Sequence, residues 1–242
     1  MSQWGGDRRV AVNVTGRISR YVSMLKGSNF QIDPRVGVGY LLLTLRERGL
    51  MKARGALRFP FRSMRPFVGS HAVIRAKAGL AFGKSVTFGH HSYVDALSTD
   101  GVHLGDNCSI GRNTRIECTG SLRYLGKGLK VGDNVGLGTD CLYGCAGGVV
   151  IGDDTIVGNM VTFHAENHRF ADLERPIRLQ GVTHLGIIVG RNCWIGAKST
   201  ILDGARIGDG CVVAAGSVVI AGEYVSNGIY GGTPARLLRS RL

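Results

Sequence analysis

The sequence is poor in proline and in acidic residues, and it lacks a long apolar run. Its 242 residues include 38 glycines but only 5 prolines, which excludes a collagen-like repeat and a proline-rich linker. The longest apolar run near the start, Val36 to Leu45, is shorter than the roughly 20 residues that a membrane-spanning helix needs. The chain also opens without a signal-peptide pattern. These absences favour an ordered, cytoplasmic protein with many tight turns.

Acidic residues are outnumbered, and the positive charge is unevenly placed. The chain has 30 Lys and Arg against 17 Asp and Glu, a formal net charge of +13. Residues 1–66 hold 13 of the basic residues and 3 of the acidic ones, so the front quarter of the chain carries most of the excess. The six cysteines include no CxxC pair, and a spacing typical of zinc or redox sites is therefore missing.

Apolar residues recur with a period of six. From Val189 onward an aliphatic residue returns at every sixth position, and a smaller residue usually follows four positions later. The same pattern occurs in shorter runs earlier in the chain. The repeated apolar positions are Leu104, Ile110, Ile116, Val131, Leu137, Ile151, Val157, Phe163, Val189, Ile195, Ile201, Ile207, Val213 and Val219. The smaller residues are Cys108, Thr114, Val135, Cys141, Thr155, Val161, Cys193, Ser199, Ala205, Cys211 and Ser217.

A period of six fits neither a helix nor a simple alternating strand. It fits short strands that change direction at turns such as Gly132-Asp133-Asn134 and stack as coils around one core. We therefore predict an all-β solenoid, a parallel β-helix. Four cysteines take the small inward position, where a free thiol acts as a small hydrophobe, whereas Cys118 and Cys145 fall near interruptions and receive no role.

Three stretches carry a resemblance to a known family. The segments Ile187 to Ala197 (IIVGRNCWIGA) and Ile207 to Val219 (IGDGCVVAAGSVV), and the closing Gly231 to Arg239 (GGTPARLLR), resemble the hexapeptide-repeat acyltransferases. The resemblance implies a left-handed parallel β-helix, a homotrimer, and acyl-CoA sites between subunits. It divides the chain into an irregular or helical N-terminal cap (1–66), a β-helix domain (67–221) with a long loop at 164–186, and a C-terminal cap segment (222–242).

The loop at 164–186 is the longest interruption of the repeat, and long excursions in a compact solenoid are usually functional. Its apolar residues Phe170, Leu173, Ile177 and Leu179 are expected to anchor it as an ordered arm. Within it, Asn167-His168-Arg169-Phe170 and Arg175-Pro176-Ile177 resemble the sugar O-acetyltransferases of the maltose and galactoside type and their polysaccharide-modifying relatives.

This resemblance implies that His168 is the catalytic base, a role that suits a side chain titrating near neutrality. Candidate acceptor-binding residues are Asp140, His164, Glu166 and Asn167. His164 could instead be structural, and Glu166 could orient His168. The family's asparagine about 30 residues before the histidine is replaced here by Gly138, which argues against maltose or galactoside as the acceptor.

For the acyl donor, the resemblance implies acetyl-CoA as co-substrate and no metal. It implies that Trp194 lies beside the pantetheine arm of CoA and that backbone groups at Ala197 and Ala215 bind the pantetheine amides. The CoA phosphates would meet basic residues near the end of the chain, namely Arg236 and Arg239, with Lys198 and Arg241 in support. The alternative for the C-terminal arginines is a solvated tail. The family's Thr-Lys pair is replaced by Ile220-Ala221, so phosphate contacts must shift.

Residues 1–66 lack the repeat. A short apolar helix or strand is expected from Tyr40 to Leu45, followed by arginines and lysines interleaved with apolar residues. The segment is either a cap for the first coil or a surface for an anionic membrane or a lipid-phosphate-linked glycan, placing the protein at the inner membrane face. No motif supports binding to nucleic acid.

The leading interpretation is an acetyl-CoA-dependent O-acetyltransferase that modifies a sugar hydroxyl in cell-surface polysaccharide biosynthesis. An N-acetyltransferase for an amino-nucleotide sugar is the main alternative. A zinc lyase like carbonic anhydrase would need His164, His168 and a third histidine, His90 or His91, to converge across a subunit boundary. A non-catalytic scaffold is the remaining possibility.

Overall fold

The computed structural model describes residues 31–33 and 35–241. The chain divides into two compact units, Met1–Met51 and Lys52–Leu242, and the boundary falls inside helix α2 (Val38–Arg58). This helix includes the predicted Tyr40–Leu45 element but is much longer than expected. Among the described residues, none of the helices combines the length and the apolarity needed to cross a membrane.

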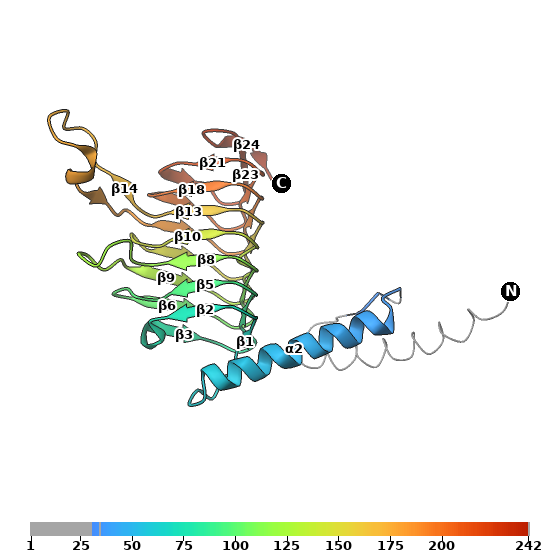
Figure 1. The fold of residues 1–242 in the computed structure, drawn as a ribbon. Coiled ribbons are helices and arrows are strands. Elements are labelled where there is room, and N and C mark those ends of the chain that lie inside the picture. Colours follow the sequence, from blue (N-terminus) through green and yellow to red (C-terminus); the bar gives the residue numbers. More distant parts are fainter. Residues whose placement is uncertain (1–30, 34, 242) are drawn as a thin grey trace. The chain divides into compact units, whose positions relative to one another are not determined.

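The second unit is a parallel β-helix with three sheets that run along the stacked coils (Figure 1). The first sheet contains β1 (Phe67–Val68), β4 (Thr87–Phe88), β7 (Ser109–Ile110), β12 (Ile156–Val157), β17 (Trp194–Ile195), β20 (Val212–Val213), β23 (Gly228–Gly231) and β24 (Arg236–Ser240). Bridges from Gly136 to Ser109 and to Ile156 make it continuous.

The second sheet contains β2 (Val73–Arg75), β5 (Tyr93–Asp95), β8 (Arg115–Glu117), β10 (Leu142–Gly144), β13 (Thr162–His164), β18 (Thr200–Leu202) and β21 (Val218–Val219). The third contains β3 (Leu80–Phe82), β6 (Gly101–Leu104), β9 (Gly128–Val131), β11 (Val149–Ile151), β16 (Ile187–Val189), β19 (Ala205–Ile207) and β22 (Gly222–Tyr224). Short 3₁₀ helices cover Lys77–Gly79 (η1) and Ile177–Leu179 (η2). The prediction of a parallel β-helix is confirmed.

Each coil turns at three corners, which we number in chain order. The first corner joins the first sheet to the second, as at Ala197-Lys198; the second corner joins the second sheet to the third; and the third corner leads back to the first sheet, as at Asn134. At the third corner Asn134 has a φ of 58°, a left-handed conformation that asparagine tolerates. Its Nδ2 donates to Oδ1 of Asp154 one coil further on, at 3.0 Å.

The glycine after an inward aliphatic residue is explained by the spacing of the coils. A Cβ on Gly196 would lie 2.5 Å from the backbone nitrogen of Ala215, and one on Gly190 would lie 2.4 Å from Oδ1 of Asp209. Only glycine admits such a close approach, so the repeat needs it where adjacent corners stack.

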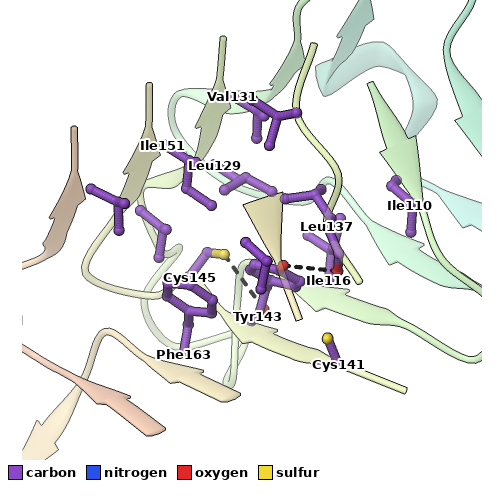
Figure 2. Close-up of a cluster of buried hydrophobic side chains, with 14 of the residues drawn as sticks. Ile110, Ile116, Leu129, Val131, Leu137, Cys141, Tyr143, Cys145, Ile151 and Phe163 are labelled. Atoms are coloured by element: carbon purple, nitrogen blue, oxygen red, sulfur yellow. Dashed lines mark hydrogen bonds between the residues drawn. The ribbon is translucent and has the colours of Figure 1, made fainter. Parts of the chain in front are cut away.

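The residues that the six-residue period predicted to face inward are all buried, and they form much of the core. Figure 2 shows the middle of this core, where the Tyr143 ring lies against the Phe163 ring. Their centroids are 4.8 Å apart, and the Tyr143 hydroxyl donates to the Leu137 carbonyl at 2.9 Å. A fully buried phenol is thus tolerated because its polar atom is satisfied.

The cysteines are all buried and free, which confirms the structural interpretation of Cys108, Cys141, Cys193 and Cys211. Cys118 and Cys145, without a role in the sequence, also fill inward positions at the second corner, where they contact each other. Burial raises the pKa of Cys193 to about 11 and raises the pKa of Cys145 well above its usual value.

The first coil is covered by residues that follow Lys52. Phe59 is buried and packs edge-on against Phe82, with ring centroids 5.1 Å apart. Arg62 donates to the Leu80 carbonyl at 2.9 Å, and Arg58 donates to the Ala72 carbonyl. Part of the basic segment therefore satisfies carbonyls at the open end of the solenoid.

We predict that Tyr143→Ala lowers the free energy of unfolding by about 3–5 kcal/mol, because it leaves a large cavity. Tyr143→Phe should cost about 1 kcal/mol, since it removes the buried hydrogen bond and little volume. Urea denaturation measures both values. Tyr124→Phe, at an exposed tyrosine, is the control, and equal stability of wild-type protein and Tyr143→Ala would contradict the packing described.

We predict that the folded protein resists thiol reagents at pH 8, because burial excludes the reagent and the raised pKa of Cys193 leaves about 0.1% of that thiol ionised. Six thiols should react in denaturant. Rapid titration of a thiol in the folded protein would show that a cysteine is accessible.

Candidate functional site

An arm leaves the second corner after β13, which ends at His164. It begins with β14 (Asn167–His168), which pairs in antiparallel fashion with β15 (Val182–Thr183), and it rejoins the coils at β16. In Figure 1 it is the orange hairpin that extends away from the coils at β14. Gln180 orders the tip: Nε2 donates to the carbonyls of Asp172 and Arg175, both at 2.7 Å.

The expectation that apolar side chains anchor the arm is wrong for a single chain. Phe170 is 64% exposed and Leu173 is 93% exposed, and Ile177 and Leu179 are about half exposed. Polar contacts hold the arm instead, because the hydrogen bonds of Gln180 to the carbonyls of Asp172 and Arg175 order the tip without a hydrophobic core. The apolar side chains are left as an uncovered surface.

A hollow of about 450 Å³ lies against the arm and includes His168. Its lining residues are Asn167, His168, Arg169, Phe170, Ala171, Asp172, Arg175, Gln180 and Thr183. All except Phe170 and Ala171 have side chains that can form hydrogen bonds. The predicted residues Asn167 and His168 therefore share one site, and both are exposed to solvent. Their residue types suit an acceptor of many hydroxyl groups, because amides, carboxylates and guanidinium groups supply both acceptors and donors.

Glu166 contacts His184 and not His168. Its Oε2 lies 2.8 Å from Nε2 of His184, a pairing that favours the tautomer with the proton on Nε2 and leaves Nδ1 as an acceptor. Sequence reasoning missed His184. Reading the arm as a hairpin would have found it, because the register that pairs Asn167 with Thr183 places Glu166 opposite His184.

The remaining acceptor candidates lie elsewhere. His164 is exposed at the end of β13, beside Gly144 and Leu202 in the neighbouring coils. Asp140 lies at the first corner with a φ of 58° and accepts a hydrogen bond from Asn113 Nδ2 at 2.7 Å. Within one chain the structure does not bring Asp140 together with the arm.

The predicted donor-side residues gather along the first sheet and the first corner. Trp194 is exposed on β17, and Ala197-Lys198 and Ala215 lie at successive first corners. Arg236 and Arg239 belong to β24, which pairs with β23 at the end of the same sheet. Arg241 donates to the Gly210 carbonyl at 2.7 Å, so its guanidinium is partly committed to the fold.

The arm and the donor-side residues lie at different corners of one chain. Leu202 is the neighbour of His164 and comes four residues after Lys198, a distance of about 13 Å along a strand. The width of the second sheet therefore separates the two groups, and a single chain holds them as two half-sites.

The histidines considered for zinc are also divided. His90 contacts the Ser70 hydroxyl at 2.7 Å through Nδ1, and His91 stacks on His71 at the first corner, whereas His164 and His168 belong to the second corner and the arm. In residues 31–33 and 35–241 of one chain, no three His, Cys, Asp or Glu side chains are grouped to hold a metal ion.

Two family models match segments of the coils. Residues 186–221 match the bacterial transferase hexapeptide family (six repeats), and residues 82–117 match the hexapeptide repeat of succinyl-transferase. Both matched segments therefore carry the repeat of hexapeptide transferases. The matched segments lie in the coils on either side of the arm, so the matches concern the scaffold and not the arm itself.

Among curated proteins, this chain is similar to the probable acetyltransferase Rv3034c of Mycobacterium tuberculosis. The two are 33% identical over 107 residues, which is 44% of this chain and 32% of that protein. The similarity thus spans about a third of the relative's length.

Among solved structures, the fold is similar to that of a variant of AntD, an N-acyltransferase from Bacillus cereus in complex with dTDP and coenzyme A. The TM-score is 0.50 with 19% identity, over 73% of this chain and 81% of that chain. A maltose O-acetyltransferase from Clostridium difficile 630 has a TM-score of 0.42 with 19% identity, over 82% and 88% of the chains. These likenesses concern the fold alone.

Proposed function

We propose that this protein transfers an acetyl group from acetyl-CoA to a sugar hydroxyl in cell-surface polysaccharide biosynthesis, with His168 as general base. The observation that carries the proposal is the exposed His168 on the rim of the arm's hollow, surrounded by hydrogen-bonding side chains. The resemblance to a probable acetyltransferase supports the acyl group.

The hollow suits a sugar because it combines polar groups of both kinds with one aromatic ring. Asp172 and Gln180 can accept from hydroxyls, while Arg169 and Arg175 can donate to ring and hydroxyl oxygens. Phe170 offers an apolar face. In a concave site, a small number of converging polar groups can fix the orientation of a small ligand.

The donor is expected along the first sheet. Arg236, Arg239 and Lys198 are exposed cations that suit the phosphates of CoA, to which arginine binds through a bidentate fork. The exposed indole of Trp194 offers an apolar wall for the pantetheine chain.

The two half-sites imply that the complete site forms between copies, as in a homotrimer. In this arrangement the arm of one copy lies along the first sheet of the next and brings His168 to the donor. The exposed apolar residues Phe170 and Leu173 on the arm, and Ile156 and Met160 at the first sheet and corner, would then be covered.

The reaction would be a direct transfer. Neutral His168 accepts the proton of the sugar hydroxyl while the hydroxyl oxygen forms a bond to the thioester carbonyl carbon. Backbone N–H groups stabilise the resulting oxyanion. When the carbon–sulfur bond breaks, protonated His168 returns the proton to the thiolate of CoA, so the enzyme ends unchanged.

We predict that His168→Ala lowers kcat at least about a hundredfold while folding and oligomeric state are retained, because general-base catalysis contributes about 10²–10⁴ in rate. CoA release with a panel of hydroxyl and amino sugars measures the rate, and His184→Ala is the matched variant. Near-normal turnover by His168→Ala together with an inactive His184→Ala would transfer the base to the Glu166–His184 pair. Preference for an amino sugar would favour N-acetylation instead.

We predict that Arg236→Gln combined with Arg239→Gln raises the Kd for acetyl-CoA at least about tenfold, because two charge-assisted phosphate contacts are lost. Calorimetry measures the Kd, and Arg123→Gln, a change at an exposed arginine in another loop, is the control.

For the wild type, acetyl-CoA at about 100 times Kd should stabilise the fold by about 2.7 kcal/mol. The absence of stabilisation at millimolar acetyl-CoA would contradict the acetyl-donor proposal.

A further inference from the structure

Helix α2 carries a leucine stripe, which we define as Leu43, Leu50 and Leu57. These residues are spaced by seven, so they deviate by only about 20° per step around an α-helix and share one face. All three are exposed, at 63%, 46% and 81%. Leu42 and Leu45 near the start of the helix are exposed as well. Apolar side chains in this number on one helix mark a surface that another phase or molecule covers.

The helix is also strongly basic. It contains Arg46, Arg48, Lys52, Arg54 and Arg58 against a single acid, Glu47. Arg46, which is exposed, lies within about 40° of the stripe, as follows from 100° per residue. Arg54 lies at a similar angle on the other side, but its Nη1 is buried. Apolar residues flanked by arginines, with almost no acid, are the composition of helices that lie in the interface of an anionic membrane.

The spacing disfavours a second helix as the occupant. A coiled-coil seam needs apolar residues at the positions three or four after each leucine. After Leu43 these are Arg46 and Glu47, and after Leu50 they are Ala53 and Arg54. A charged seam would place like arginines together, whereas a lipid surface accepts the leucines and pairs the arginines with its phosphates.

We propose that helix α2 binds the surface of an anionic membrane, with the leucine stripe inserted among the acyl chains near the headgroups and the exposed Arg46 at the lipid phosphates. The helix lies on the membrane and does not cross it, consistent with its charge. This proposal is independent of the proposed catalytic function, because α2 contributes no residue to the arm or to the donor-side group.

The test is sedimentation of the full-length protein with vesicles. Phosphatidylcholine vesicles are compared with vesicles that contain about 30% phosphatidylglycerol, whose negative surface attracts basic segments. We expect binding at least about tenfold tighter to the anionic vesicles, and weaker binding at about 0.5 M salt than at 0.1 M, because salt screens the attraction. Equal binding to both vesicles, or binding to neither, would overturn the proposal.

Two matched variants distinguish binding through the leucine stripe from nonspecific binding through other exposed apolar residues. Leu43→Ser, Leu50→Ser and Leu57→Ser together should weaken vesicle binding at least about tenfold, because apolar area leaves the lipid. The control, Leu122→Ser, Leu125→Ser and Val225→Ser, removes exposed apolar residues of the second unit and should bind as the wild type does.

Circular dichroism and the oligomeric state accompany both variants. If the triple variant fails to fold, Leu50→Glu, which keeps helix propensity and puts one charge on the stripe, replaces it with the same expected loss. A stripe variant that binds vesicles like the wild type overturns the proposal. A stripe variant that loses self-association but retains vesicle binding also overturns the proposal, because a second copy of the chain would then cover the stripe.

Discussion

The stacking of one coil on the next is the constraint on which the rest of this molecule depends. The strands of the coils are two to four residues long and too short to be stable alone, and most persist because they pair in register with the coil before and the coil after. That register requires every coil to turn in the same places, so inward apolar residues, small corner residues and close-packed glycines recur together. A change in one coil is therefore felt by its neighbours through backbone hydrogen bonds and core contacts.

The longest departure from this regularity holds the candidate base. The arm at the second corner is stabilised by its own hairpin and by Gln180, so the scaffold supports it without constraining its sequence. It gathers His168 and several polar groups around one hollow, and the Glu166–His184 pair lies at its base. The regular coils offer instead a flat sheet with Trp194 and terminal arginines. These two surfaces are separate within one chain, so the proposed function requires a second copy to complete the site.

The cations near the front of the chain have two kinds of surroundings. Arg58 and Arg62 donate to carbonyls of the first coil, so part of the positive charge closes the solenoid. The exposed leucine stripe and Arg46 have no such explanation in the β-helix. The contacts with the first coil and the proposed lipid surface therefore use different residues of this segment.

The six-residue period by itself determined the β-helix, the inward residues and the buried state of four cysteines, because each of these follows from local spacing repeated many times. The tertiary structure alone decided the rest. It extended a short expected element into a 21-residue helix, left the arm's apolar residues exposed, and paired Glu166 with His184. It also separated Asp140 and the donor-side residues from the arm. Those relations depend on which corner of the solenoid a residue reaches, and a linear period does not state how the irregular segments leave and rejoin the coils.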